Sequence, residues 1–239
     1  MLKITCEGTL LSQTLKAINA VCREAVLVAD FDGIKVLGID SANVAFIDLK
    51  VSKDEFKEYR LKSESEFGIP VEKLIPLCSA MDKEEFVCLD VGDGRLKLTF
   101  GNHEYAIRTL SVKTVRRPQR VPNNLGTERA EFTVPSTILS DIIKSSKIVE
   151  NCMIVRMIAD VNSFRYIIES DDETIRQNYE VKNNQFANAL YSLDYLKDFN
   201  VGINVDTIDL KFQTDSPLSI DFIFGNGGGS IRYLLAPRM

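Results

Sequence analysis

The sequence predicts an α+β protein built from two similar halves, in which most strands run antiparallel. Only a few segments carry apolar residues at helical spacing, and most of the others have strand composition. Asp-Gly and glycine-rich stretches separate several of the strands, as in hairpins. The order strand, helix, strands, helix, strands occurs twice along the chain, and it differs from the strict alternation of a parallel α/β fold.

In the first half, residues 9–25 are predicted to form a helix because Leu11, Leu15, Ile18 and Cys22 make an apolar stripe. Pro70 stands where a second helix could begin. Asp32-Gly33 is typical of a hairpin turn. Strands are predicted over residues 25–30, 34–39, 44–51, 66–69, 85–90, 95–100 and 104–112.

The second half repeats this order. A helix is predicted over residues 138–149 and a short one over residues 189–199. The glycine-rich residues 225–230 are predicted to connect two strands rather than to bind phosphate, because no helix and no Lys-Ser/Thr pair follow them. Strands are predicted over residues 129–134, 153–159, 164–170, 175–181, 207–213, 218–224 and 230–235.

The composition is that of an ordinary globular protein. The 239 residues are 45% hydrophobic and 26% charged, with a net charge of −5. We expect no membrane span and no signal peptide, because no long apolar run occurs and the first residues lack a basic-then-apolar pattern. The five cysteines are widely spaced among apolar residues, which favours free thiols in a reducing cytoplasm.

The sequence offers few groups for catalysis. His103 is the one histidine of the chain, so sites that need two or three histidines are excluded. No GxSxG, Walker or GxGxxG motif occurs, and no CxxC pair could hold zinc. We therefore expect no catalytic residue, no metal and no cofactor.

A basic connector separates the halves. Residues 111–131 hold five basic and two acidic residues, so this segment carries +3 and the rest carries −8 of the total −5. Its prolines, asparagines and glycine argue against regular structure. We predict an N-terminal domain over residues 1–112, a connecting loop over residues 113–129, and a C-terminal domain over residues 130–239.

Four motifs together resemble PCNA-type DNA sliding clamps. Residues 38–49 (GIDSANVAFIDL) resemble the family's MD-x-x-x-V-x-x-V-x-L signature, and residues 191–196 (YSLDYL) resemble its last helix. Residues 214–218 (TDSPL) resemble the D-x-P-L turn, and residues 233–238 (YLLAPR) resemble the C-terminal motif. The motifs occur in order over essentially the whole chain, which ends without an acidic tail, as in archaeal members.

The resemblance implies a DNA-clamp fold, in which helices line a ring and antiparallel sheets lie outside. It implies a homotrimer that encircles duplex DNA without sequence preference and acts as a processivity factor in DNA replication and repair, with no enzymatic activity. The expected partners are a clamp loader, DNA polymerase, ligase and nucleases that carry short clamp-binding peptides, and no membrane. We expect a cytoplasmic, nucleoid-associated protein.

The resemblance also assigns surfaces to residues. The expected DNA-facing residues are Lys16, Asn19, Arg23, Lys73, Lys144, Lys147 and Lys197. The expected peptide pocket comprises Ile39, Val44, Phe46, Val121, Leu125, Pro217, Leu234, Ala236 and Pro237. The expected subunit interface pairs residues 105–109 with residues 164–168 of a neighbour and comprises Tyr105, Ile107, Arg108, Arg165, Tyr166 and Ile168.

This chain differs from its family in its charges. Asp141 and Asp194 stand where relatives carry basic residues, so we expect weak contact with DNA. Three alternatives remain open: one subunit of a heterotrimeric clamp, a hydrolase that uses His103 with a carboxylate such as Glu104, and an interaction scaffold that never contacts DNA.

Overall fold

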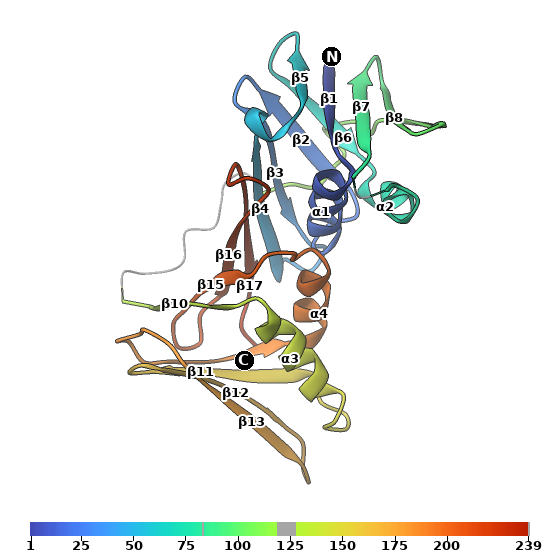
Figure 1. Ribbon diagram of the computed structural model, residues 1–239. Helices are drawn as coiled ribbons and strands as arrows, with labels where there is room; N and C mark the ends of the chain where they lie inside the picture. Colours follow the sequence, from blue (N-terminus) through green and yellow to red (C-terminus); the bar gives the residue numbers. More distant parts are fainter. Residues whose placement is uncertain (83, 119–127, 239) are drawn as a thin grey trace. The chain divides into compact units, whose positions relative to one another are not determined.

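The computed structural model describes residues 1–82, 84–118 and 128–238, and it forms two compact units (Figure 1). Unit 1 comprises Met1–Val121 and Ile223–Ile231, and unit 2 comprises Pro122–Phe222 and Arg232–Met239. The sequence prediction had assigned all of residues 130–239 to the second domain. The structure instead places Ile223–Ile231 with unit 1.

Unit 1 contains two antiparallel sheets with helices packed against them. One sheet has the strand order β5-β1-β7-β8-β9, and the other has β6, β2, β3 and β4 side by side. The helices are α1 (Gly8–Asn19) and α2 (Val71–Leu74), with 3-10 turns at Lys53–Glu55 and Ile75–Ser79. The strands are β1 (Leu2–Glu7), β2 (Ala25–Asp30), β3 (Gly33–Ile39), β4 (Ala45–Ser52), β5 (Glu58–Leu61), β6 (Ser65–Ile69), β7 (Phe86–Gly92), β8 (Arg95–Phe100) and β9 (His103–Arg108).

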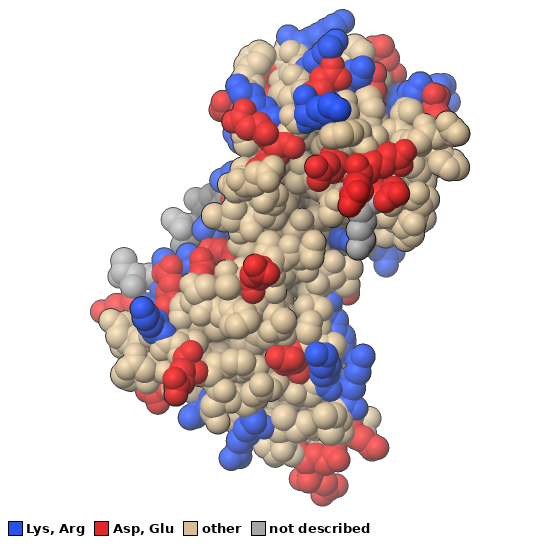
Figure 2. Space-filling view, in the orientation of Figure 1, with Lys and Arg blue, Asp and Glu red and all other residues tan. Residues whose placement is uncertain are grey.

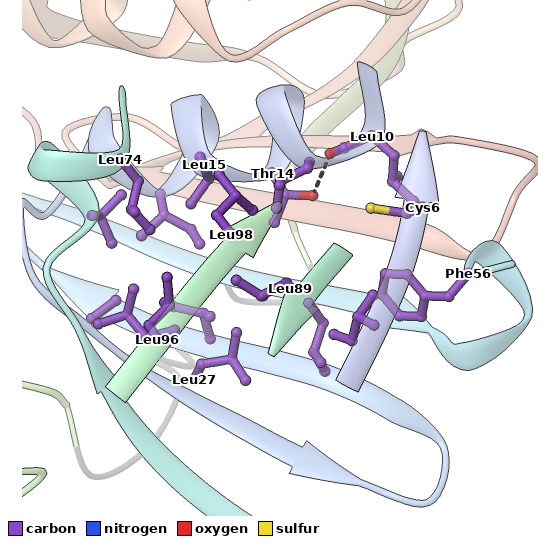
Figure 3. Close-up of a pocket in the computed structure, with 18 residues that line it drawn as sticks. Cys6, Leu10, Thr14, Leu15, Leu27, Phe56, Leu74, Leu89, Leu96 and Leu98 are labelled. Carbon is purple, nitrogen blue, oxygen red and sulfur yellow. Dashed lines mark hydrogen bonds between the residues drawn. The ribbon is translucent and has the colours of Figure 1, made fainter. Parts of the chain in front are cut away.

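The core of unit 1 lies between α1 and the strands. Leu15 of α1 and Leu98 of β8 are among the buried residues that surround an apolar cavity of about 40 Å³ (Figure 3). The one hydroxyl in this lining belongs to Thr14, and it donates a hydrogen bond to the Leu10 carbonyl at 2.8 Å. The cavity therefore presents no unsatisfied hydroxyl, and it is a packing space within the core.

Unit 2 repeats the arrangement of elements. One sheet has the order β13-β12-β11-β14, and β10, β15 and β16 lie side by side in the other. The helices are α3 (Thr137–Ser146) and α4 (Leu193–Val201). The strands are β10 (Ala130–Pro135), β11 (Ile154–Asp160), β12 (Ser163–Glu169), β13 (Thr174–Glu180), β14 (Ala187–Ser192) and β15 (Thr207–Phe212). Two further strands, β16 (Leu218–Phe224) and β17 (Gly229–Leu235), are divided between the units, because Ile223–Ile231 belongs to unit 1.

Aromatic side chains fill the core of unit 2. The rings of Phe199 and Tyr233 stack at 4.3 Å between centroids, and Phe132, Phe164 and Phe212 contact one another at 5.1–6.4 Å. All five are buried. Aromatic residues bury large apolar areas and prefer such offset or edge-on contacts, so this cluster stabilises the packing of β10, β12 and β15.

The predicted order of elements is confirmed in both units, since β1-α1-β2-β3-β4 corresponds to β10-α3-β11-β12-β13. Three predicted helices are too long. The helix predicted over residues 9–25 ends at Asn19, and that over residues 138–149 ends at Ser146. In residues 189–199, only α4 is helical. The preceding residues form β14, where Ala187, Ala189 and Tyr191 are buried at the two-residue period of a strand.

One predicted edge strand is wrong. Residues 164–168 lie in β12, which pairs with β11 on one side and with β13 on the other. Its backbone groups are therefore already used, and Tyr166 and Ile168 are fully buried, so neither they nor Arg165 lie on a free edge. Within the described residues, six strands are outermost in their sheets: β5, β6 and β9 in unit 1, and β10, β13 and β14 in unit 2.

Candidate functional site

The predicted DNA-facing residues of unit 1 lie on or near its helices. Lys16 and Asn19 are half-buried on α1, and Lys73 is exposed on α2. Arg23 follows the end of α1 rather than belonging to it. Its side chain is 82% exposed, and it forms an ion pair of 3.8 Å with Glu72. The unit therefore offers two exposed cations here, of which Arg23 already has a carboxylate next to it.

The predicted DNA-facing lysines of unit 2 also lie beside carboxylates. Lys144 lies 3.6 Å from Asp141 on α3, and Lys197 lies 3.1 Å from Asp194 on α4. Lys147 is exposed just after the end of α3. Figure 2 shows basic side chains gathered over the part of unit 2 that holds α3, with acidic ones next to them.

These neighbours set the electrostatic character of the helices. On α4, burial and the nearby Asp194 carboxylate raise the pKa of Asp198 above its usual value. The two lysines of α3 and α4, together with Lys147 just after α3, are balanced by the three aspartates of these helices. Because the charges of this surface nearly cancel, its attraction to phosphates comes from individual lysines, and salt screens that attraction readily.

In unit 1, the predicted pocket residues Ile39, Val44 and Phe46 lie at the turn between β3 and β4. Ile39 and Phe46 are directly opposite each other in the antiparallel register. The buried Asp40 carboxylate shapes the turn, because it accepts hydrogen bonds from the amides of Val44 at 2.7 Å and Ala45 at 2.9 Å. The turn therefore holds Ile39 and Val44 in fixed positions.

Two arginines of the basic connector attach it to unit 1. Arg116 donates hydrogen bonds to the Ser41 carbonyl at 2.8 Å and to Asn43 Oδ1 at 2.5 Å. Arg117 donates to Glu66 at 2.7 Å. Sequence reasoning missed this role, because the partners lie 51 to 75 residues away along the chain.

In unit 2, the predicted pocket residues Pro217, Leu234, Ala236 and Pro237 lie near the chain end. Leu234 is 8% exposed, and the other three are half-buried. The Arg238 amide donates a hydrogen bond of 2.8 Å to the Leu190 carbonyl, and this bond fixes the tail against β14. The predicted pocket residues Val121 and Leu125 lie outside the described residues.

Two of the edge strands, β9 and β13, are mostly polar. On β9, Arg108 is exposed, and Tyr105 and Ile107 are half-buried. On β13, the sequence Thr-Ile-Arg-Gln-Asn-Tyr-Glu leaves only Ile175 and Tyr179 half-buried. The outward backbone groups of each strand are available to another strand, since each pairs on one side only within the described part of the chain.

The glycine-rich residues 225–228 form the turn between β16 and β17, as predicted. Their amides surround an anion, which is the carboxylate of Glu55. Glu55 Oε1 accepts hydrogen bonds from the amides of Asn226 at 3.0 Å and Gly228 at 2.7 Å. Gly225 and Gly227 have φ values of +66° and +102°, which favour glycine. The chain's own carboxylate thus occupies the place that a phosphate would need.

The remaining candidates for catalysis lack a suitable environment. His103 is exposed at the start of β9, and the adjacent Glu104 carboxylate pairs with Lys97 at 2.6 Å. Burial raises the pKa of the Cys6 and Cys22 thiols to about 12, which suppresses the nucleophilic thiolate. Within the ranges that the structure describes, no group of three metal-ligating side chains occurs, and no helix is long and apolar enough to cross a membrane.

The sequence is similar to that of known DNA sliding clamps. Residues 1–115 match the family described as proliferating cell nuclear antigen, N-terminal domain. A DNA polymerase sliding clamp of Methanocorpusculum labreanum is 32% identical, over 100% of this chain and 99% of the relative. One of Archaeoglobus fulgidus is 26% identical over the same shares.

Solved structures agree in fold. The structure described as the C-terminal region of FEN-1 bound to A. fulgidus PCNA superposes with a TM-score of 0.91 at 25% identity, over 100% of this chain and 99% of that one. PCNA from Thermococcus kodakaraensis superposes with a TM-score of 0.86 at 17% identity, over all of both chains. The second likeness concerns the fold alone.

Proposed function

The chain belongs to the PCNA-type family of DNA polymerase sliding clamps, and from this premise we propose that three copies close into a ring around duplex DNA. The ring tethers DNA polymerase and other replication and repair enzymes to their template. The observation that carries the proposal is the full-length similarity to named sliding clamps. It is supported by the edge positions of β9 and β13, which are two of the six outer strands within the described residues.

Closure uses these two edges. A β9 strand of one copy pairs with a β13 strand of the next, and this pairing satisfies the outward backbone groups of both. The contact joins two different surfaces, so it continues from copy to copy until the ring closes. Arg108 on β9 is exposed and available to carboxylates of the neighbour. The same pairing leaves β12 in the interior of its sheet.

DNA is held by enclosure more than by charge. The helices carry the DNA-facing residues Lys16, Asn19, Lys73, Lys144 and Lys197, and Arg23 and Lys147 lie just beyond helix ends. Carboxylates 3.1–3.8 Å away weaken three of the cations. Contacts of this kind are independent of sequence and break easily, so a closed ring slides along the duplex.

Client enzymes bind through short peptides. The structure of A. fulgidus PCNA contains a C-terminal region of FEN-1, and we propose that this chain binds comparable peptides. The proposed contacts for the apolar anchors are Ile39, Val44 and Phe46 in unit 1. In unit 2, the proposed client-binding residues are Pro217, Leu234, Ala236 and Pro237. The protein catalyses no reaction of its own and works at the nucleoid in the cytoplasm.

Native mass measurement tests the ring. We expect three times the 26.9 kDa of one chain at micromolar concentration. We also expect the protein, loaded by a clamp loader and ATP, to stay on a nicked circular plasmid and to leave after a restriction enzyme linearises it. A mass of one chain would contradict the homotrimer and favour the heterotrimer. Equal retention on both DNA forms would contradict encirclement.

Proline substitutions test which strand closes the ring. Adjacent residues of a strand direct their N–H groups to opposite sides, so either Arg176→Pro or Gln177→Pro removes an outward N–H of β13. Whichever of the two substitutions removes the outward N–H is expected to give a monomer with an unchanged circular dichroism spectrum. If both variants fold and remain trimeric, β13 is not the closing edge.

A further inference from the structure

A groove of about 560 Å³ lies over the outer face of one sheet in unit 1. Its lining contains apolar and charged side chains of the sheet, together with Arg117 and Pro118 of the connector. The lining comprises Val26, Val28, Lys35, Leu37, Asp48, Lys50, Glu66, Arg117 and Pro118. No residue of this set has been given a role in DNA, client or subunit binding above.

The strand register places the groove next to the proposed client pocket. Leu37 of β3 is opposite Asp48 of β4, and the pair Ile39 and Phe46 lies two residues farther along the same strands. Residues two apart in a strand share a face and are about 7 Å apart. The groove is therefore continuous with the part of the pocket that unit 1 supplies.

The cations of the groove already have carboxylate partners. Lys35 donates a hydrogen bond of 2.6 Å to Asp30, and Arg117 donates one of 2.7 Å to Glu66. Lys50 is more than half exposed and lies 3.6 Å from Asp48 Oδ2, which is beyond hydrogen-bond distance. The groove thus has no cation that lacks a carboxylate within 4 Å.

Asp48 is the groove residue with a side-chain oxygen that lacks a hydrogen bond in the described part of the chain. Its side chain is 10% exposed, and its Oδ1 atom is buried without a hydrogen-bond partner among the described residues. A buried carboxylate oxygen without a donor is costly, and a ligand that brings a donor to it is favoured. The apolar neighbours Val26 and Leu37 leave room for an aliphatic stem beside the carboxylate.

We propose that this groove binds a basic side chain, arginine or lysine, of the client segment next to the apolar anchors. The aliphatic stem lies along Val26, Val28 and Leu37, and the guanidinium or ammonium donates to Asp48. An extended peptide spans about 3.3 Å per residue, so the basic residue lies two to four positions from the anchors. This inference rests on the proposed client binding and adds a specificity determinant to it.

The experiment measures fluorescence anisotropy with labelled clamp-binding peptides. One peptide set carries arginine at positions two to four from the anchors, on either side, and matched sets carry glutamine or glutamate there. The protein is used as the full chain and as two variants. Asp48→Asn removes the groove carboxylate, and Asp93→Asn removes one negative charge of the same unit at a turn with a φ of +48°, which asparagine accepts.

We expect one arginine position to strengthen binding about five- to twentyfold over glutamine, and Asp48→Asn to abolish this gain while Asp93→Asn keeps it. The glutamine peptide should bind equally to all three proteins, which shows that the variants fold. The inference would be wrong if the arginine, glutamine and glutamate peptides bound equally, if the glutamate peptides bound best, or if the gain from arginine survived Asp48→Asn. These outcomes would leave the proposed client binding intact. If no peptide bound at all, the proposed client binding itself would be wrong.

Discussion

Glu55 links the glycine-rich hairpin to the turn after β4, and its replacement by alanine should loosen the hairpin. The carboxylate accepts the amides of Asn226 and Gly228, at 2.7–3.0 Å. The Ser52 amide also donates to the Gly228 carbonyl at 2.8 Å, so the hairpin has one attachment that survives the substitution. The change therefore tests one defined contact rather than the whole turn.

The expected magnitude follows from the exposure of the two amides. A hydrogen bond to a charged acceptor contributes about 1.5–3 kcal/mol when it is shielded from water. The Asn226 amide is exposed, so water replaces its lost bond, whereas the Gly228 amide is partly buried. We expect Glu55→Ala to lower the free energy of opening of the hairpin by about 1.5 kcal/mol, or about tenfold in the opening equilibrium.

Hydrogen exchange of the segment Ile223–Ile231 measures this effect locally, without assuming that both units unfold together. Glu55→Gln keeps one acceptor oxygen and should lose about half as much protection. Asp54→Ala is the matched control, because Asp54 contacts Ser52 rather than the hairpin. Exchange that is unchanged in Glu55→Ala, or equally fast in the control, would refute the reasoning.

Three further outcomes are expected. Val36→Ile should fill part of the 40 Å³ cavity and raise the free energy of unfolding in urea by about 0.5–1 kcal/mol, whereas a decrease would mean that the cavity cannot accept a methyl group. Asp141→Asn should steepen the salt dependence of DNA binding, and Lys147→Ala should flatten it, by about one unit of slope or less each. The hydrogen bond from Lys211 holds the pKa of Glu131 below its ordinary value of 4.5. The ionised Glu131 carboxylate therefore stabilises the fold above pH 4.5, and this stabilisation is lost as the pH falls through the lowered pKa. Glu131→Gln should therefore reduce the loss of stability measured between pH 5 and pH 3.

Local pattern predicted the hairpins well and the ends of helices poorly. Residues 218–224 were assigned as a strand with the bounds that β16 has, because apolar residues alternate there and glycines follow. Residues 189–192 were assigned to a helix, because the apolar residues Leu190, Leu193 and Leu196 satisfy helical spacing across the boundary between β14 and α4. Spacing alone cannot locate such a boundary.

The order of strands in a sheet was harder to infer than the strands themselves. β12 alternates Phe164, Tyr166 and Ile168 toward the core, as an inner strand does, whereas β13 is polar along most of its length. Polar and charged side chains are common on edge strands, so the composition of β13 contained the signal that identifies the edge. Contacts across 70 or more residues, such as that of Arg116 with Ser41, leave no comparable signal in a single sequence.

The balance of charge on α3 and α4 bears on how the protein holds DNA. Two lysines and three aspartates lie on these helices, with Lys147 just after α3, so an open chain has little electrostatic attraction to phosphate. If attraction held the protein on DNA, breaking the ring would weaken binding in proportion to the cations lost. If enclosure holds it, a chain that folds but cannot close should be lost from circular DNA altogether, while its helices keep the same lysines. A closed ring with nearly neutral helices therefore combines long residence on a circle with rapid movement along it, because the two properties depend on different features of the molecule.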